Sequence, residues 1–194
     1  MPVHFRQLQK GDIDAVVKLQ NSNSIIINPA LDRADGALSS AFTAEDIAAF
    51  NANLAVVVCM DDEGKLLGFN CCSTPEFNKG IALVKAMMSG FDRAQIEGKA
   101  LALWNCVITG PVCVEKASRG SGVFQGLYAK LWDLLPPQYD LAVALVSTSN
   151  KRSLAAHIKI GMVEVDQFAF KDSSYCTLAM KILHSGNKNI ALWQ

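Results

Sequence analysis

Two glycines lie close together in Arg119-Gly120-Ser121-Gly122, between an apolar run and a stretch with helical spacing. We expect the apolar run from Pro111 to Glu115 to be a strand and the helix to extend from Gly122 to about Leu135. The first turn of a helix carries N–H groups without intrahelical partners, and the macrodipole adds partial positive charge there. Because glycine has no Cβ, the backbone of such a turn can approach an anion closely. The chemistry that this turn could support is the binding of a phosphate or pyrophosphate.

Two common phosphate loops do not fit this turn. A Walker A loop closes with Gly-Lys-Ser/Thr, whereas this turn closes with Gly122-Val123. A dinucleotide fingerprint needs a third glycine, but Gly126 comes one residue late, and that fingerprint usually lies in the first βα turn of its fold. The remaining alternative is a tight turn that binds no ligand.

A second polar segment follows the apolar run from Leu141 to Val146. Asn150 is placed to cap a helix from Lys151 to Ile160, and its amide could instead contact a ligand. His157 lies further along the same helix, and an imidazole suits proton transfer near neutral pH. A lone histidine on a helix is also commonly structural, so both interpretations stay open.

Together the two segments resemble the GNAT superfamily of acyltransferases. The cofactor motif of that family, Gln/Arg-x-x-Gly-x-Gly/Ala, aligns with Ala117 to Gly122, with alanine at the leading position. Its downstream pattern, Asn-x-x-Ala-x-x-x-Tyr-x-x-x-Gly-Phe, aligns with Asn150 to Met162, with His157 in the place of tyrosine. The resemblance implies direct transfer of an acetyl group from acetyl-CoA to a small-molecule or peptide amine in a ternary complex. The two departures keep an alternative open, which is a catalytically weak or inactive acyl-CoA-binding sensor or scaffold.

The resemblance also implies which residues hold coenzyme A. Backbone N–H groups around Arg119 to Phe124 would hold the pyrophosphate, with the Arg119 side chain near its charge, and Val112 and Val114 would lie beside the pantetheine arm. The predicted cofactor-binding residues are Val112, Val114, Arg119, Gly120, Ser121, Gly122, Val123, Phe124, Asn150 and Ser153.

Three residues are predicted to act in catalysis. By resemblance, the main-chain N–H near Val114, at a bulge in the strand, would stabilise the oxyanion, and His157 would protonate the departing thiolate. Glu115 could be the base, directly or through water. Further candidate bases in the segment expected to flank the acceptor pocket are Glu76, Asp92 and Glu97. The pocket itself is expected between residues 21–53 and 74–105, and the sequence does not identify the acceptor.

These motifs need a scaffold, and the remaining patterns predict it. The expected order is strand, helix, helix, strand, strand, helix, strand, helix, strand, helix, strand, strand. We expect hairpins at 54–72 and 162–182, and a helix at 81–88. The predicted fold class is α/β (α+β), a GNAT-like mixed, partly parallel central sheet flanked by helices. Residues 1–183 are expected to form the acyltransferase domain and residues 184–194 a C-terminal tail.

The composition narrows the classes of partner. Of the 194 residues, 18 are basic and 18 acidic, which gives no electrostatic reason to expect nucleic acid or an anionic membrane as partner. The apolar runs are too short to span a bilayer and no secretory signal is evident, so we expect a cytoplasmic protein. The six cysteines and three histidines lack metal-ligand spacing, so no metal is expected and the cysteines should be buried. Exposed strands at the sheet ends could pair between two copies, which would form a homodimer.

Overall fold

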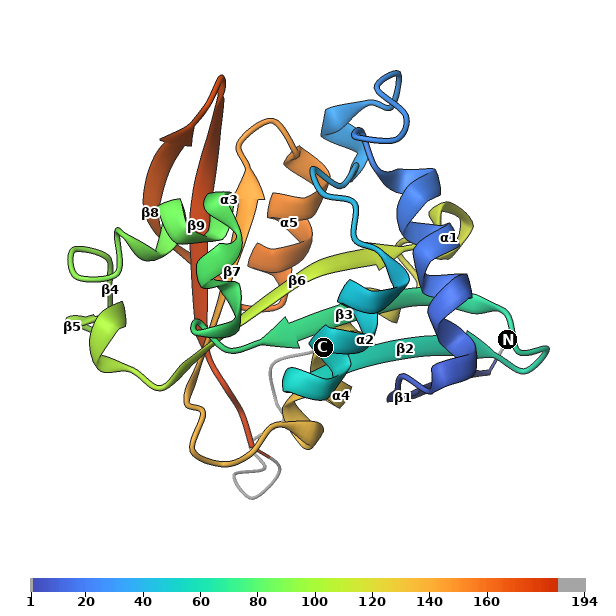
Figure 1. Cartoon of the computed structure of the whole chain (residues 1–194). Helices are drawn as coiled ribbons and strands as arrows, with labels where there is room; N and C mark the ends of the chain where they lie inside the picture. Colours follow the sequence, from blue (N-terminus) through green and yellow to red (C-terminus); the bar gives the residue numbers. More distant parts are fainter. Residues whose placement is uncertain (1, 185–194) are drawn as a thin grey trace.

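A seven-stranded sheet forms the centre of the computed structural model, which describes residues 2–184 (Figure 1). Its strands lie in the order β1-β2-β3-β6-β7-β9-β8. The neighbours β6 and β7 are parallel, and the other neighbouring pairs are antiparallel. The predicted mixed, partly parallel sheet is therefore confirmed. The strands are β1 (Val3–Gln7), β2 (Ala55–Asp61), β3 (Leu66–Ser73), β6 (Cys106–Val114), β7 (Leu141–Ser147), β8 (Val163–Phe170) and β9 (Ser173–Lys181).

Helices cover both faces of this sheet, as predicted. The helices are α1 (Ile13–Asn23), α2 (Ala44–Asn53), α3 (Ala82–Met88), α4 (Val123–Leu134) and α5 (Lys151–Lys159). Alternation along β2 assigns the faces, because Val56 and Val58 pack with α1 and α2, whereas Val57 and Cys59 pack with α4. A capping box between Thr43 and Asp46 opens α2, with both of its hydrogen bonds present.

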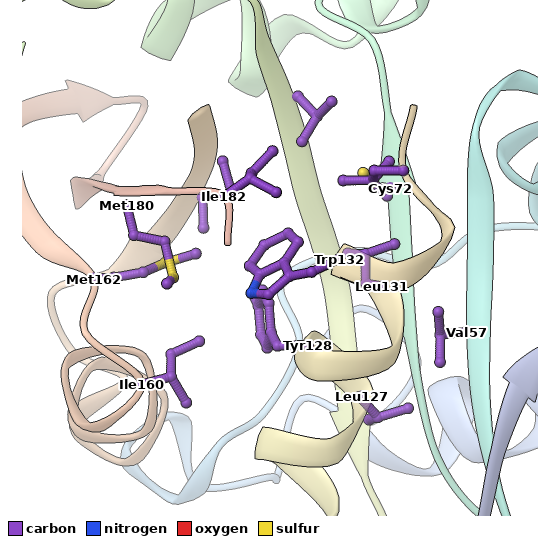
Figure 2. Packing of buried hydrophobic residues seen from close by; sticks show 14 of the residues in the cluster. Val57, Cys72, Leu127, Tyr128, Leu131, Trp132, Ile160, Met162, Met180 and Ile182 are labelled. Atoms are coloured by element: carbon purple, nitrogen blue, oxygen red, sulfur yellow. The ribbon is translucent and has the colours of Figure 1, made fainter. Parts of the chain in front are cut away.

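The core beneath α4 explains why glycine occupies positions 68 and 126. Figure 2 shows Tyr128, Leu131 and Trp132 of this helix among buried side chains that include Met162 and Ile182. At Gly68 of β3 there is no room for a side chain. An added Cβ would lie 3.2 Å from Leu127 Cδ1 of α4 and 2.9 Å from the Cys113 carbonyl oxygen of β6. The third glycine of the turn region, Gly126, is likewise a packing position, since a Cβ there would collide with the Phe5 ring.

The structure departs from the predicted elements in the middle of the chain. The strand predicted from Pro111 to Glu115 begins earlier, since β6 extends from Cys106 to Val114. Gln95–Ile96 (β4) and Lys99–Ala100 (β5) form a small hairpin that is absent from the predicted order. Two-residue strands carry too little periodicity to be recognised from sequence.

The two parallel strands separate shortly after they pair. Strand β6 pairs with β7 only from Cys106 to Ile108. Opposite the next residues of β6, the pairing with β3 shifts register between Asn70 and Cys72. The predicted bulge at Val114 is therefore misplaced, because Val114 pairs in register with Gly68 and the irregularity lies around Gly110, whose φ is 114°. This separation of β6 from β7 opens the sheet where the site lies.

All six cysteines are buried and free, as predicted. Burial raises the pKa of the Cys113 thiol to about 12, so it stays protonated at neutral pH. Within residues 2–184, no helix is long and apolar enough to cross a membrane. Most of the predicted tail, residues 185–194, lies outside the described residues.

Candidate functional site

A groove runs from the start of α4 into the interior, between β6, the end of β7 and α5. We call its two cavities the outer pocket, of about 130 Å³, and the inner pocket, of about 140 Å³. Val112 and Ser153 line both cavities, so the two are adjacent. The inner pocket is also lined by residues of the segments 37–42 and 78–84 and by Phe50 of α2. These residues fall within the two segments from which the acceptor pocket was expected.

The outer pocket brings together most of the predicted cofactor residues. It is lined by Val112, Val114, Arg119, Gly120, Phe124 and Ser153, together with neighbours from α4 and α5. Asn150 lies further in and lines the inner pocket. Three predicted residues line neither cavity, namely Ser121, Gly122 and Val123, and the Val123 side chain belongs to the core under α4.

The turn before α4 has the geometry that an anion site requires. Gly120 and Gly122 both adopt the left-handed conformation, with φ of 83° and 90°, and Gly122 is the N-cap residue. No side chain caps the helix there, so its first-turn amides face outwards without that partner. An ideal Cβ at either glycine would meet no heavy atom within 4 Å, so the space in front of the turn is open. These features fit a phosphate at the helix N-terminus.

The edge of β6 supplies further donors along the groove. The Glu115 amide donates to the Leu67 carbonyl across the β3–β6 ladder, at 2.8 Å. Amides alternate in direction along an antiparallel pair, so those of Val114 and Val112 point away from β3. They face the opposite side of β6, where β7 no longer pairs with it. The groove therefore has two backbone N–H groups along one wall.

Arg119 is placed differently from the expectation that its charge lies near the pyrophosphate. Its guanidinium donates to the Asp35 carbonyl at 2.7 Å, to Asn23 Oδ1 at 3.0 Å and to the Val114 carbonyl at 3.2 Å. These partners lie at the end of α1, in the segment between α1 and α2, and on β6. A role at the phosphates stays a prediction, and it would require the guanidinium to leave or share these partners.

The segment between α1 and α2 reaches across the groove beside α5 (Figure 1). The Asp35 carboxylate lies 2.7 Å from Arg152 Nε and 3.5 Å from both Lys116 Nζ and Arg119 Nη1. These cations, Arg152 foremost, lower the pKa of Asp35. Sequence reasoning missed this cluster because Asp35 is far from its partners along the chain and belongs to no motif.

Asn150 has the capping role that the sequence predicts. Its Oδ1 accepts from the Ser153 amide at 3.1 Å, at the start of α5. Its Nδ2 donates to the Ala37 carbonyl at 3.0 Å and so ties the crossing segment to the helix. Contact with a cofactor was the other interpretation, and it stays a prediction.

His157 forms part of a buried hydrogen-bonded chain. Its Nδ1 lies 2.7 Å from the Ser153 carbonyl, which can only accept, so Nδ1 carries the proton. Nε2 must then accept from the Tyr128 hydroxyl at 3.1 Å, and that hydroxyl also contacts Thr109 Oγ1 at 3.2 Å. Burial lowers the pKa of His157 to about 4 and raises that of Tyr128. The imidazole is therefore neutral at pH 7, with both nitrogens occupied.

Tyr128 was expected only to pack, and its polar contact with His157 is a finding of the structure. The two residues come from different helices, and their rings meet at 5.9 Å between centroids. A tyrosine facing the core of an apolar helix is the only signal of this contact in the sequence. That signal cannot identify the partner.

The candidate bases lie outside the inner pocket. Glu115 accepts from Ser118 Oγ at 3.2 Å and lies 3.7 Å from Lys65 Nζ. Glu76 pairs with Lys79, and Glu97 pairs with Lys181. Asp92 is exposed in the turn after α3. No acidic residue therefore lines the inner pocket within the described chain.

Several solved structures with a similar fold are described as acetyltransferases. The chain superposes on an N-acetyltransferase from Staphylococcus aureus Mu50 with a TM-score of 0.60 and 17% identity, over 94% of this chain and 100% of that one. The protein yncA of Salmonella typhimurium, solved with its cofactor acetyl-CoA, gives 0.61 and 16%, over 93% and 94%. A GNAT superfamily phosphinothricin acetyltransferase from Sinorhizobium meliloti, in complex with AcCoA, gives 0.61 and 13%, over 97% and 93%.

The similarity is one of structure. No family model matches the sequence, and no curated protein matches it. At identities below one fifth, the comparison shows a shared fold. The chain has the fold of the GNAT acetyltransferases.

Proposed function

We propose that this protein is an N-acetyltransferase that moves an acetyl group from acetyl-CoA directly to an amine. The observation that carries the proposal is the pair of adjacent pockets that lead from the two-glycine turn, past the free edge of β6, to the inner pocket. A long thioester cofactor needs an anion site at one end and a sheltered reaction centre at the other, and the groove offers both. Structural neighbours solved with acetyl-CoA support the choice of cofactor.

The chain's own residues would divide the work as follows. Acetyl-CoA, when bound, supplies an activated thioester acyl group. The amides of the turn around Gly120 and Gly122 hold the phosphates, and the Val114 amide, which lies at the outer pocket, orients the pantetheine arm. The role of donor to the carbonyl oxygen, predicted for Val114, falls to the Val112 amide, because Val112 also lines the inner pocket and Val114 does not.

The catalytic roles predicted for His157 and Glu115 enter the proposal with the constraints that their contacts set. The His157 proton is already donated to the Ser153 carbonyl, so His157 can give a proton to a thiolate only if that bond opens. Glu115, beside Lys65, can act only through water, because it does not line the inner pocket.

The direct test is product formation. The purified chain is incubated with acetyl-CoA and a panel of amines, and acetylated amine and free coenzyme A are quantified by mass spectrometry. The proposal predicts equal amounts of both products and a rate that depends on the amine. Binding of acetyl-CoA without acetylation of any amine would instead support the sensor or scaffold alternative.

A pair of glycine variants tests the turn. Gly122→Ala adds a Cβ at a left-handed N-cap, facing the open space that the phosphate would occupy. We expect the dissociation constant for acetyl-CoA to rise about tenfold, since one anion contact is worth roughly 1–2 kcal/mol. Gly64→Ala is the matched control, because Gly64 has a φ of 79° and equal free space but lies in the β2–β3 turn. Equal affinities in the two variants would contradict a phosphate site at Gly122.

A further inference from the structure

We propose that the acceptor is a weakly basic aromatic amine, which enters the inner pocket as a neutral molecule. This inference rests on the proposed function and names the substrate class of the same site. Among the described residues that line the inner pocket there is no Asp, Glu, Lys or Arg. The one titratable side chain among these described residues is His157, whose nitrogens are both hydrogen-bonded.

The absence of a lining carboxylate limits the charge that the pocket accepts. An alkylamine resembles lysine, with a pKa near 10.4, so it reaches the protein almost entirely as an ammonium ion. Burying an unpaired ammonium costs several kcal/mol, and nothing that lines this pocket would pair with it or remove its proton. An arylamine shares its lone pair with the ring and is neutral at pH 7, so it avoids that cost.

The same walls exclude other acceptor classes. An amino acid or a phosphorylated amine would bring an anion into a pocket that has no cationic side chain. The basic residues nearest the groove, Arg119 and Arg152, face the outer pocket and are engaged with Asp35. A polyamine would bring additional ammonium groups and would need several carboxylates. The pocket therefore favours an acceptor that carries no charge.

The shape and lining of the inner pocket suit one aromatic ring. Phe42 and Phe50 meet edge to face at 5.1 Å between ring centroids, and both line the pocket. Ile81, Val84 and Ile108 complete an apolar wall. A cavity of about 150 Å³ lined by such residues in another protein binds benzene, and the inner pocket measures about 140 Å³. Aromatic rings also pack favourably edge to face against a phenylalanine wall.

The reaction balances without a charged base. The amine nitrogen forms a bond to the acetyl carbon, the carbon–sulfur bond breaks, and the proton that nitrogen loses ends on the departing sulfur. A neutral amine loses one proton, during this step. An ammonium ion must lose one proton before the step and a second proton during it. A pocket without a carboxylate therefore favours the first kind of acceptor.

The isomers 4-methylaniline and benzylamine test the inference, because they contain the same atoms and differ mainly in basicity. With the full chain and saturating acetyl-CoA, we expect kcat/KM at pH 7 to be at least about tenfold higher for 4-methylaniline. Its value should stay level from about pH 6 to about pH 9, whereas that for benzylamine should rise with its neutral fraction. Faster acetylation of benzylamine at pH 7, or acetylation of other amines only, would overturn this inference and leave the acetyltransferase standing. A chain that does not bind acetyl-CoA would overturn the proposed function as well.

A charge introduced into the pocket wall provides a second test. Ser40 is half-buried and lines the inner pocket, so Ser40→Asp places a carboxylate there and Ser40→Asn is its uncharged match. We expect Ser40→Asp to raise kcat/KM for benzylamine about tenfold relative to Ser40→Asn, because a carboxylate can pair with the ammonium. The value for 4-methylaniline should not rise. Equal benzylamine rates in the two variants would contradict a pocket limited by charge.

Discussion

At the scale of single residues, His157 shows how burial sets a protonation state. The neutral imidazole donates from Nδ1 to the Ser153 carbonyl and accepts at Nε2 from the Tyr128 hydroxyl. A second proton would have to enter a fully buried site that offers no carboxylate partner, which is why the pKa of His157 falls to about 4. In the unfolded chain the imidazole regains its ordinary pKa near 6.5.

This difference predicts an acid-sensitive fold. Between about pH 6.5 and about pH 4 the unfolded chain binds a proton at His157 that the folded chain does not, so the free energy of unfolding falls as the pH is lowered. The loss should approach about 3 kcal/mol at the acid end of that window. Urea unfolding at several pH values should show a smaller loss for His157→Gln, which can still bond to Tyr128. His4→Gln, which removes an exposed imidazole, should keep the wild-type dependence on pH. If His157→Gln loses as much stability as the wild type, the imidazole is not buried as a neutral group.

The residues that the sequence identifies correctly are those whose partners are close in the chain. Asn150 caps α5 through an amide three residues away, so its type and position suffice. Arg119 is different, because it binds Asn23 and Asp35, which are brought to it only by the packing of the segment between α1 and α2. The contact of Tyr128 with His157 depends in the same way on how α4 and α5 lie against each other.

At the scale of elements, the segment between α1 and α2 is the part of the site that the sequence describes least. Its Asn, Asp, Ser and Ala residues predict a loop, and the structure shows one, with a 3₁₀ turn at Arg33–Asp35. The loop contributes to the site through Asp35, whose carboxylate faces Lys116, Arg119 and Arg152 beside the outer pocket. The carboxylate therefore neutralises cations that lie close to the turn proposed to bind phosphate.

Removing this carboxylate should strengthen cofactor binding. Asp35→Asn removes the negative charge that faces the three cations, so we expect the dissociation constant for acetyl-CoA to fall by about three- to tenfold at low salt, and by less at high salt. Asp62→Asn changes the net charge equally at an aspartate that pairs with His4, and should leave the affinity unchanged. Titration calorimetry at two salt concentrations measures both variants. Weaker binding by Asp35→Asn would show instead that the ion pairs are needed to hold the groove together.

The strands and helices themselves were largely predictable. Their order followed from apolar periodicity, glycine turns and caps, and these local signals agree with the sheet that forms. The continuous strand β6 was not predicted, because Gly110 and Pro111 interrupt its pattern although the chain continues through them. That interruption coincides with the register shift from which β6 and β7 separate, so the element hardest to predict is the one that opens the groove.

At the scale of the whole molecule, the sheet places two different environments at the ends of one groove. The outer end has an uncapped helix N-terminus, two left-handed glycines and nearby cations, which together suit phosphate. The inner end is lined mainly by apolar residues and otherwise by uncharged polar ones, which suits a neutral amine. Transfer between a phosphate-bearing thioester and such an amine is the activity that this arrangement supports best.

The measurement that tests this account most directly is calorimetric titration of the purified chain with acetyl-CoA, coenzyme A and 3′,5′-ADP. Because the groove has donors for the phosphates and for the pantetheine arm, the account predicts that acetyl-CoA and coenzyme A bind at about micromolar concentration. It also predicts that 3′,5′-ADP, which lacks the arm, binds at least about tenfold more weakly. Equal binding of all three would limit the site to phosphate, and no binding of any would contradict the central claim.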